Sequence, residues 1–212
     1  MYNILVIGID KREVSFLRNI LKEYGNRSIL IEKAIGSTLD YRSEKKRSKL
    51  AFVRYLIDSR IYSLDQNYAI EDLNSSKIPL RDAHLVLGLE PLETLKSLKY
   101  ISEKTVVILN THQIDIKESM QDSKKKINYP SIAQIIDILD QLARKLFALD
   151  FNELSINYFN SQNYSTIIAL GMGIKEFQDI FYKKLMLTIL REFHKDPSRC
   201  IDAFELGNEL ID

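Results

Sequence analysis

The chain has 212 residues, 45% of them hydrophobic and 28% charged, which is enough to bury one large core. Thirty basic and 29 acidic residues give a formal net charge of +1, which argues against the basic face of a nucleic-acid-binding protein. No apolar run approaches the roughly 20 residues that a membrane-spanning helix needs, and the first residues lack the features of a signal peptide. We therefore expect a cytoplasmic protein that binds neither nucleic acid nor membrane.

Cysteine and histidine usage limits the redox and metal chemistry of the chain. Cys200 is the only cysteine, which excludes an internal disulfide, an iron–sulfur cluster held by thiolates and a structural zinc site. The histidines His84, His112 and His194 lie far apart in sequence and lack the i, i+4 pairing of helical metal sites. We therefore expect no metal ligand among them, and any electron-carrying centre must lie on another chain.

The first part of the chain predicts a β-α-β unit. An apolar run at 3–7, closed by a glycine, is typical of a buried parallel strand. Apolar residues within 14–24 follow at helical spacing, and Gly25-Asn26 supplies a stop signal. A second strand is expected at 28–32. Units of this kind commonly begin a doubly wound sheet.

The next segment predicts a hairpin. Residues 50–57 are rich in strand-forming side chains, and a second strand-like run at 60–63 follows the polar pair Asp58-Ser59. Because the arms of a hairpin are antiparallel, the sheet is expected to be mixed.

Buried strands resume after this hairpin. Strands are predicted at 83–87 and 105–109, where short apolar runs end in polar residues. A short helix is predicted between them at 90–98, with Pro91 in its first turn.

The remainder of the chain is mainly helical by pattern. The predicted elements are a helix that Ser131 caps and that continues to Leu146, a short strand at 147–149, and helices at 165–174, at 177–193 and from Pro197 to near Gly207. The predicted fold is therefore α/β: a three-layer Rossmann-like sheet, mixed and with a β-hairpin, followed by a helical C-terminal third. Residues 1–212 are expected to form a single domain.

The end of the first strand lacks a nucleotide-binding motif. In an open α/β sheet ligands bind beyond the carboxyl ends of the strands, but only Gly8 of a G-x-G-x-x-G fingerprint is present there. Asp10, Lys11, Arg12 and Glu13 follow it, and their side chains would keep a pyrophosphate away from the backbone. We therefore expect no NAD or flavin bound in the usual Rossmann manner.

No residue of this chain is predicted to be catalytic, because no nucleophile motif is present. Glu90 and Glu93 are interpreted as favourable negative charge at a helix start rather than as an acid–base pair. Arg199 could lower the pKa of the neighbouring Cys200 thiol, but a half-buried helical cysteine is the preferred interpretation.

Several segments, all in the same order, resemble one family. The run Leu-Gly-Leu-Glu-Pro-Leu-Glu at 87–93 resembles the GLEPLE segment of the gamma subunits of 2-oxoacid:ferredoxin oxidoreductases. It is especially similar to the small (beta) subunit of indolepyruvate:ferredoxin oxidoreductase. Further similar segments are Asn110-Thr111, Tyr129-Pro130-Ser131, 147–150, 167–171 and the Ala-Phe-Glu-Leu-Gly run at 203–207. The resemblance covers the chain from end to end.

The resemblance implies oxidative decarboxylation of a 2-oxoacid with coenzyme A, which gives an acyl-CoA, carbon dioxide and reduced ferredoxin. It implies that thiamine diphosphate, Mg²⁺ and the iron–sulfur clusters lie on a larger catalytic partner subunit, and that ferredoxin reacts through the complex. This chain would bind no cofactor and would not be active by itself, and coenzyme A would be a co-substrate. Neither the 2-oxoacid nor the oligomeric state follows from the sequence, and a homodimer stays open.

Two glycine-rich loops of the family are altered in this chain. The family has G-x-G-G-Q-G after the first strand, where only Gly8 is kept here. It also has a G-M-A-Q-R-G-G-S loop, where 41–48 is charged and only Ser48 is kept; Val53-Arg54 on the following strand are also kept. Both loops are expected to face a shared active-site cleft. The chain is therefore either a working subunit or a diverged, non-catalytic paralogue that serves as a scaffold, regulatory or binding protein.

Basic residues near these loops suggest another way to hold coenzyme A. Lys45, Lys46, Arg47 and Lys49 could attract its phosphates electrostatically, although a solvated loop is the simpler interpretation. The residues predicted for this coenzyme A or cleft site are Gly8, Lys11, Arg12, Lys45, Lys46, Arg47 and Ser48.

Overall fold

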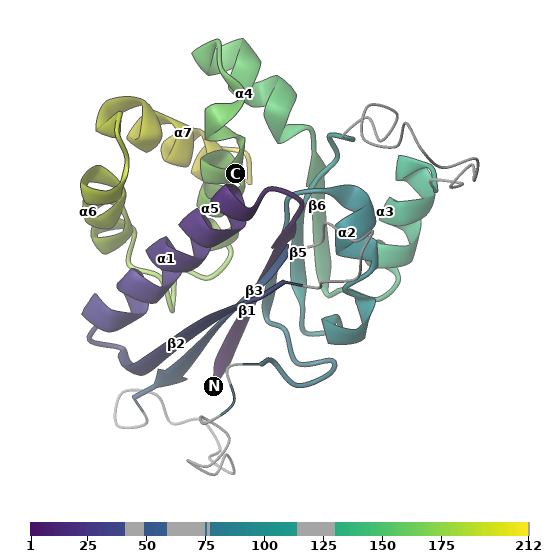
Figure 1. The fold of residues 1–212 in the computed structure, drawn as a ribbon, viewed down its shortest axis with the longest axis horizontal. Helices are drawn as coiled ribbons and strands as arrows, with labels where there is room; N and C mark the ends of the chain where they lie inside the picture. The colour runs from purple at the N-terminus through teal and green to yellow at the C-terminus, as the bar shows by residue number, and fades with distance from the viewer. Residues whose placement is uncertain (41–48, 59–74, 76, 114–129, 212) are drawn as a thin grey trace.

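A mixed sheet forms the centre of the molecule (Figure 1) in a computed structural model that describes residues 1–40, 49–58, 75, 77–113 and 130–211. Its strands are β1 (Tyr2–Gly8), β2 (Ile31–Asp40), β3 (Lys49–Ile57), β4 (Leu85–Gly88), β5 (Val106–Asn110) and β6 (Lys145–Leu149). Their order across the sheet is β2-β3-β1-β4-β5-β6. The neighbours β1, β4, β5 and β6 are parallel, whereas β3 is antiparallel to β1 and β2. The predicted α/β class and mixed sheet are therefore confirmed.

β2 and β3 form an antiparallel hairpin that the sequence did not predict. β2 and β3 pair antiparallel from Ile31 opposite Ile57 to Asp40 opposite Lys49. The predicted strand at 50–57 is confirmed as β3, but it lies between β1 and β2, so the two strands of the β-α-β opening are not neighbours. The predicted second arm at 60–63 lies outside the described residues.

Helices cover both faces of the sheet (Figure 1). One face carries α1 (Lys11–Arg27), α5 (Ser165–Lys175), α6 (Lys183–Phe193) and α7 (Pro197–Glu209). The other carries α2 (Pro91–Leu95), the 3-10 helix η2 (Leu98–Tyr100) and α3 (Ile132–Asp140). Between β6 and α5 the chain forms α4 (Phe151–Phe159) and the 3-10 helix η4 (Gln162–Tyr164).

Alternation along β1 explains this three-layer arrangement. Ile4 and Val6 point into the core beneath α1 and α5, whereas Leu5 and Ile7 point into the core on the face of α2 and α3. All four side chains are buried, because a central strand of a mainly parallel sheet has an apolar layer on each side.

The C-terminal third is helical as predicted, with shifted boundaries. The capping box of Ser131 begins α3 as expected, but the helix ends at Asp140 and Leu146 lies on β6, so the long apolar stripe was wrong. The last predicted helices are α6 and α7, but α6 begins only at Lys183 and α7 continues past Gly207.

Two glycines allow α5 and α7 to cross at very short range. A Cβ atom at Gly171 would lie 2.2 Å from the carbonyl oxygen of Phe204, and one at Gly207 would lie 2.0 Å from that of Ile168. Buried Asn208 donates hydrogen bonds from Nδ2 to the carbonyl oxygens of Gly171 (3.0 Å) and Phe204 (3.1 Å). Only glycine permits this backbone approach, so two segments that resemble the family pack against each other.

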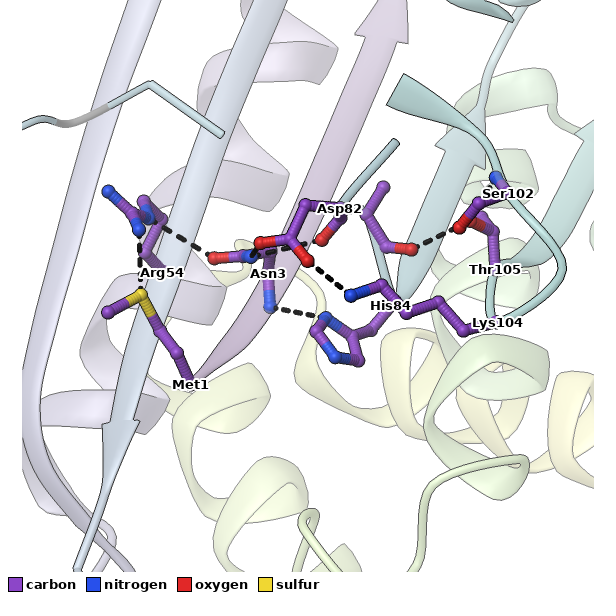
Figure 2. A network of polar contacts seen from close by, with 9 residues as sticks. Met1, Asn3, Arg54, Asp82, His84, Ser102, Lys104 and Thr105 are labelled. Carbon is purple, nitrogen blue, oxygen red and sulfur yellow. Dashed lines mark hydrogen bonds and ion pairs between the residues drawn. The ribbon is translucent and has the colours of Figure 1, made fainter. Parts of the chain in front are cut away.

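A partly buried polar network joins the carboxyl half of β3 to the amino-terminal ends of β1, β4 and β5 (Figure 2). Arg54 on β3 is 2% exposed and donates from Nε to Oδ1 of Asn3 on β1 (3.1 Å). Asn3 donates from Nδ2 to Oδ2 of Asp82 (2.7 Å), and Lys104 forms an ion pair with Oδ1 of the same carboxylate. The backbone N–H of Asn3 donates to Nδ1 of His84 (3.1 Å). The buried polar side chains of β1 and β3, Asn3 and Arg54, are therefore hydrogen-bonded to each other.

Candidate functional site

The carboxyl ends of the parallel strands meet at one edge of the sheet, where open α/β folds bind ligands. β1 ends there at Gly8, β4 at Gly88 and β5 at Asn110. The segment between β2 and β3 starts and ends at the same edge, because Lys49 pairs with both Asp40 and Gly8. The sequence prediction that the two altered loops meet at one edge is consistent with this register.

Gly8 itself is part of the packing at this edge. A Cβ atom there would lie 3.0 Å from Cβ of Leu89 and 3.4 Å from Cγ2 of Val14. The backbone N–H of Leu89 also donates to the carbonyl oxygen of Ile7 (2.8 Å). Gly8 therefore lets the turn after β4 close onto the end of β1, and its predicted contact with a ligand stays a prediction.

Acidic side chains occupy the start of α1. Asp10 caps the helix by accepting a hydrogen bond from the backbone N–H of Arg12 (2.7 Å). Burial, and then repulsion by Asp10, raise the pKa of the Glu13 carboxyl group. A phosphate group at this helix start would have to displace the Asp10 carboxylate, and this cap adds to the sequence argument against a dinucleotide site.

The basic residues of the predicted site are only partly described. Lys11 and Arg12 are exposed on the first turn of α1, beside the end of β1. Arg12 reaches back to Asp10, with 3.5 Å between Nη2 and Oδ2. The remaining members, Lys45, Lys46, Arg47 and Ser48, lie outside the described residues.

Glu90 and Glu93 behave as the sequence indicated. Glu90 is 2% exposed and caps α2, because its Oε2 accepts from the backbone N–H of Glu93 (2.7 Å). Glu93 is also buried, and its Oε1 lies 2.5 Å from Nζ of Lys96. The interpretation as negative charge at a helix start is confirmed.

A cluster at the ends of β5 and β6 was not predicted from the sequence. Asn110, which is 6% exposed, accepts at Oδ1 from the backbone N–H groups of Phe151 (3.1 Å) and His112 (3.3 Å). Its Nδ2 donates to Oδ1 of Asn152 (2.8 Å). Nδ1 of His112 lies 3.3 Å from Oδ2 of Asp150. The only sequence signal was position, because each of these residues lies at or just after the end of a strand.

Cys200 is not a reactive thiol. It is buried in α7, and burial, together with the charge of Asp196, raises its pKa to about 12. Arg199 lies beside it in sequence but is paired with Asp196, with 3.8 Å between Nε and Oδ2. The idea that Arg199 lowers the pKa of Cys200 was therefore wrong, and the cysteine is fully rather than half buried.

The chain's single cysteine does not fit an iron–sulfur cluster held by thiolates. The described residues contain no group of three or more histidine, cysteine or acidic side chains arranged to hold a metal ion. The whole sequence has a single cysteine, whereas iron–sulfur clusters are typically held by four protein ligands. Within the same described ranges, no helix is both long and apolar enough to cross a membrane.

Comparison with known proteins identifies relatives of the chain, although no protein-family model matches it. Indolepyruvate oxidoreductase subunit IorB of Archaeoglobus fulgidus is 30% identical over 110 residues, which span 52% of this chain and about half, 53%, of that protein. Subunit IorB of Methanothermobacter thermautotrophicus is 31% identical over 141 residues, which span 66% of this chain and 69% of that protein. This chain belongs to the IorB family. Histidinol-phosphate aminotransferase of Clostridium botulinum is less similar, with 26% identity over 188 residues and 52% of its length covered.

Solved structures share the fold of this IorB-family chain. The gamma subunit of a keto/oxoacid ferredoxin oxidoreductase from Geobacter sulfurreducens has a TM-score of 0.57 and 12% identity, over 99% of this chain and 97% of that one. Pyruvate oxidoreductase subunit PORC of Thermotoga maritima has a TM-score of 0.59 and 11% identity, over 98% and 95% of the two chains. The 2-oxoglutarate:ferredoxin oxidoreductase of Magnetococcus marinus has a TM-score of 0.56 and 10% identity, over 99% of this chain but 30% of that one. The two IorB relatives and these structural neighbours are thus oxoacid oxidoreductases or subunits of them.

Proposed function

We propose that this chain is the small subunit of a 2-oxoacid:ferredoxin oxidoreductase, which converts a 2-oxoacid and coenzyme A to an acyl-CoA, carbon dioxide and reduced ferredoxin. The observation that carries this proposal is membership of the IorB family. The fold supports it, because residues 1–212 correspond almost completely to a gamma subunit, and we propose that they form one domain.

The proposal assigns the redox chemistry to a larger partner subunit in the cytoplasm. That partner would carry thiamine diphosphate, Mg²⁺ and the iron–sulfur clusters and would pass electrons to ferredoxin. Two observations support this division: the chain has one cysteine, which is buried, and the Magnetococcus marinus enzyme has this fold as 30% of a longer chain. By this reasoning the chain has no turnover without its partner.

A second candidate function is a non-catalytic scaffold or regulatory protein with the same fold. The observation that favours it is the start of α1, where the Asp10 carboxylate caps the helix at the position of the family's glycine-rich loop. Such a protein would keep the packing glycines Gly171 and Gly207, but it would have no thiamine-dependent partner.

Co-purification separates these two functions. An affinity-tagged copy of the chain, isolated from its native cells, is expected to bring down a larger protein that contains thiamine diphosphate and iron. The measurements are mass spectrometry, a thiochrome assay and metal analysis of the isolated complex, with an untagged strain as control. Recovery of the chain as a monomer or homodimer without thiamine and iron would support the second function and reject the first.

We also propose that basic side chains at the altered loops attract the phosphates of coenzyme A. The site comprises Gly8, Lys11, Arg12, Lys45, Lys46, Arg47 and Ser48. Lys11 and Arg12 are exposed beside the end of β1, and their positions support this site. Positive charges at the carboxyl edge of the sheet attract an anionic ligand as it approaches and so raise its rate of association.

Calorimetric titration of coenzyme A into the purified complex tests this site. Joint replacement of Lys45, Lys46 and Arg47 by glutamine is expected to weaken binding by about tenfold or more, and the effect should shrink at high salt. The matched control replaces Lys124, Lys125 and Lys126 by glutamine, which removes the same charge from the other lysine cluster of the sequence. Equal affinity of the two triple variants would reject the site.

A further inference from the structure

A histidine and a carboxylate meet at the carboxyl edge of the sheet, outside the residues predicted for coenzyme A binding. His112 follows β5 and Asp150 follows β6, and the parallel pairing of these strands brings their ends together. Nδ1 of His112 lies 3.3 Å from Oδ2 of Asp150. The two side chains are 37% and 32% exposed, so a ligand at this edge can reach them.

This contact determines which imidazole nitrogen faces a ligand. A carboxylate accepts hydrogen bonds, so Nδ1 carries the hydrogen that points to Asp150. Nε2 is then the proton acceptor of the neutral ring, and it is turned away from the carboxylate. No residue in the described ranges is hydrogen-bonded to Nε2.

A buried asparagine holds both members of the pair in place. Oδ1 of Asn110 accepts from the backbone N–H of His112 and from that of Phe151, which directly follows Asp150. Asp150 is further fixed by its second oxygen, because Oδ1 accepts from the backbone N–H of Glu153 (2.8 Å) and caps α4. The pair is thus supported by rigid neighbours, as a preorganised site requires.

The proposed reaction needs a proton acceptor, and this step of the argument rests on the proposed function. A 2-oxoacid is already ionised at neutral pH. Its carboxylate is therefore lost as carbon dioxide without the release of a proton. The two electrons of the cleaved bond pass to ferredoxin. The proton that is released overall therefore comes from the thiol of coenzyme A, which must lose it to form the thioester.

Other acidic side chains at this edge are less suited to the task. Asp10 and Glu90 each accept a backbone N–H at a helix start, and Glu90 is buried as well. Histidine is the side chain whose ordinary pKa lies nearest to neutral pH, which is the condition for an efficient general base.

We propose that His112, supported by Asp150, is the base that accepts the thiol proton of coenzyme A in the assembled enzyme. The S–H bond breaks and its proton moves to Nε2, and the sulfur electron pair forms the C–S bond of the thioester. The electron pair left by decarboxylation reduces the ferredoxin acceptors, so atoms and charge balance. Asp150 stabilises the imidazolium ion, and Asn110 is a positioning residue.

The test uses the complex purified with the tagged chain and compares His112→Gln with Asp150→Asn. Glutamine cannot take the proton, so His112→Gln is expected to lower coenzyme A-dependent turnover by about 100-fold. Asparagine caps a helix as well as aspartate does, so Asp150→Asn keeps α4 and removes only the charge, with an expected loss of about tenfold. The matched control is His194→Gln, at a histidine that lies at the end of α6 and interacts with the backbone of Asp196. The complex with His194→Gln should turn over at the wild-type rate.

Three further measurements separate proton transfer from a structural role. Release of carbon dioxide from the 2-oxoacid in a single turnover without coenzyme A should be unchanged in His112→Gln, because this step precedes thiol attack. Calorimetric affinity for coenzyme A should stay within about threefold of wild type, since the base acts in the transition state. Added imidazole should restore turnover of His112→Ala by about tenfold, because it replaces the missing base.

The outcomes distinguish this inference from the proposed function. Two results would overturn the role of His112 and leave the proposed function intact. One is wild-type turnover in His112→Gln, and the other is an equal loss of carbon dioxide release and of turnover in that variant. If the wild-type chain co-purifies with no partner that contains thiamine and iron, the proposed function is rejected. The role of His112 is then rejected as well.

Discussion

Replacing Gly207 with alanine is expected to lower the free energy of unfolding by about 3 kcal/mol, at the upper end of the usual cost of overpacking. The added methyl group would lie 2.0 Å from the carbonyl oxygen of Ile168 and 3.0 Å from the backbone N of Met172. Both atoms belong to the backbone of α5, so no side chain can move aside and the two helices must separate. Separation would also weaken the hydrogen bond that Asn208 donates to Gly171 across the crossing.

Helix propensity makes this prediction sharper, because it acts in the opposite direction. Alanine is about 1 kcal/mol more favourable than glycine within a helix, and Gly207 lies inside α7. A measured loss of stability therefore reports the contact between the helices. Thermal unfolding should show a midpoint lowered by about 6–12 °C for a protein of this length.

Gly173→Ala provides the matched control on α5. Its added methyl group would lie 3.1 Å from Cδ2 of Leu87 and 3.3 Å from Cδ2 of Leu85, which are the flexible ends of side chains. The cost is expected to stay within about 1 kcal/mol, offset by the gain in helix propensity. If Gly207→Ala unfolds at the same temperature as Gly173→Ala, the close crossing of α5 and α7 is wrong.

Burial explains which strands could be predicted from the sequence. β4 and β5 are buried on both faces, so their apolar residues are consecutive and the pattern is unambiguous. β2 is an edge strand whose central residue Gly36 lies beside the side chains of Lys22 and Arg18 rather than in the core. Its polar composition hid its length, and its antiparallel pairing with β3 was therefore not predicted.

Long-range contacts explain the helix boundaries that were missed. Phe177 and Phe181 have helical spacing with the residues of α6, but both lie before it. They pack edge-on against Tyr2 at the start of the chain, with ring centroids 5.1 Å and 6.0 Å away. A contact between residues far apart in the sequence overrides local periodicity, and no local pattern reports it.

The candidate site was predictable as a location but not as a set of contacts. The strand ends at Gly8, Gly88 and Asn110 were expected to share an edge, and the parallel register confirms this. The pair of His112 and Asp150 depends on β6 lying beside β5, and no pairing partner could be predicted for the short strand at 147–149. Its chemistry therefore became visible only with the sheet order.

Lowering the pH from 7 to 4 is expected to destabilise the fold through His84 by up to about 3 kcal/mol, at roughly 1.4 kcal/mol for each pKa unit. Burial, with Lys104 as the next cause, lowers the pKa of His84 from 6.5 to about 4. Between these values the unfolded chain binds a proton at this imidazole and the folded chain does not. The contribution of the neutral His84 ring to the free energy of unfolding is therefore fully present above about pH 6.5. It is lost as the pH falls towards 4.

The hydrogen bonds of His84 give the physical reason for this direction. Its Nδ1 accepts from the backbone N–H of Asn3, and the backbone N–H of His84 donates to the carbonyl oxygen of Asn3 (2.8 Å), which ties β4 to β1. A proton on Nδ1 would remove the acceptor and place a positive charge near Lys104, the N-terminal amino group and Arg144, and only Asp82 would offset this repulsion. Figure 2 shows His84, Lys104 and Asp82 side by side. Either change would weaken the buried pairing of β4 with β1.

His84→Asn separates this effect from the titration of acidic groups. The asparagine oxygen can take the position of Nδ1 and accept from Asn3, but it cannot be protonated in this range. Its stability should differ from wild type by a constant amount above pH 7, because the contact with the ring of Tyr2 is lost at every pH. Between pH 6.5 and 4 the two curves of urea-unfolding free energy should converge, since only the wild type loses stability through this side chain. Parallel curves over that interval would show that His84 titrates alike in the folded and unfolded chains.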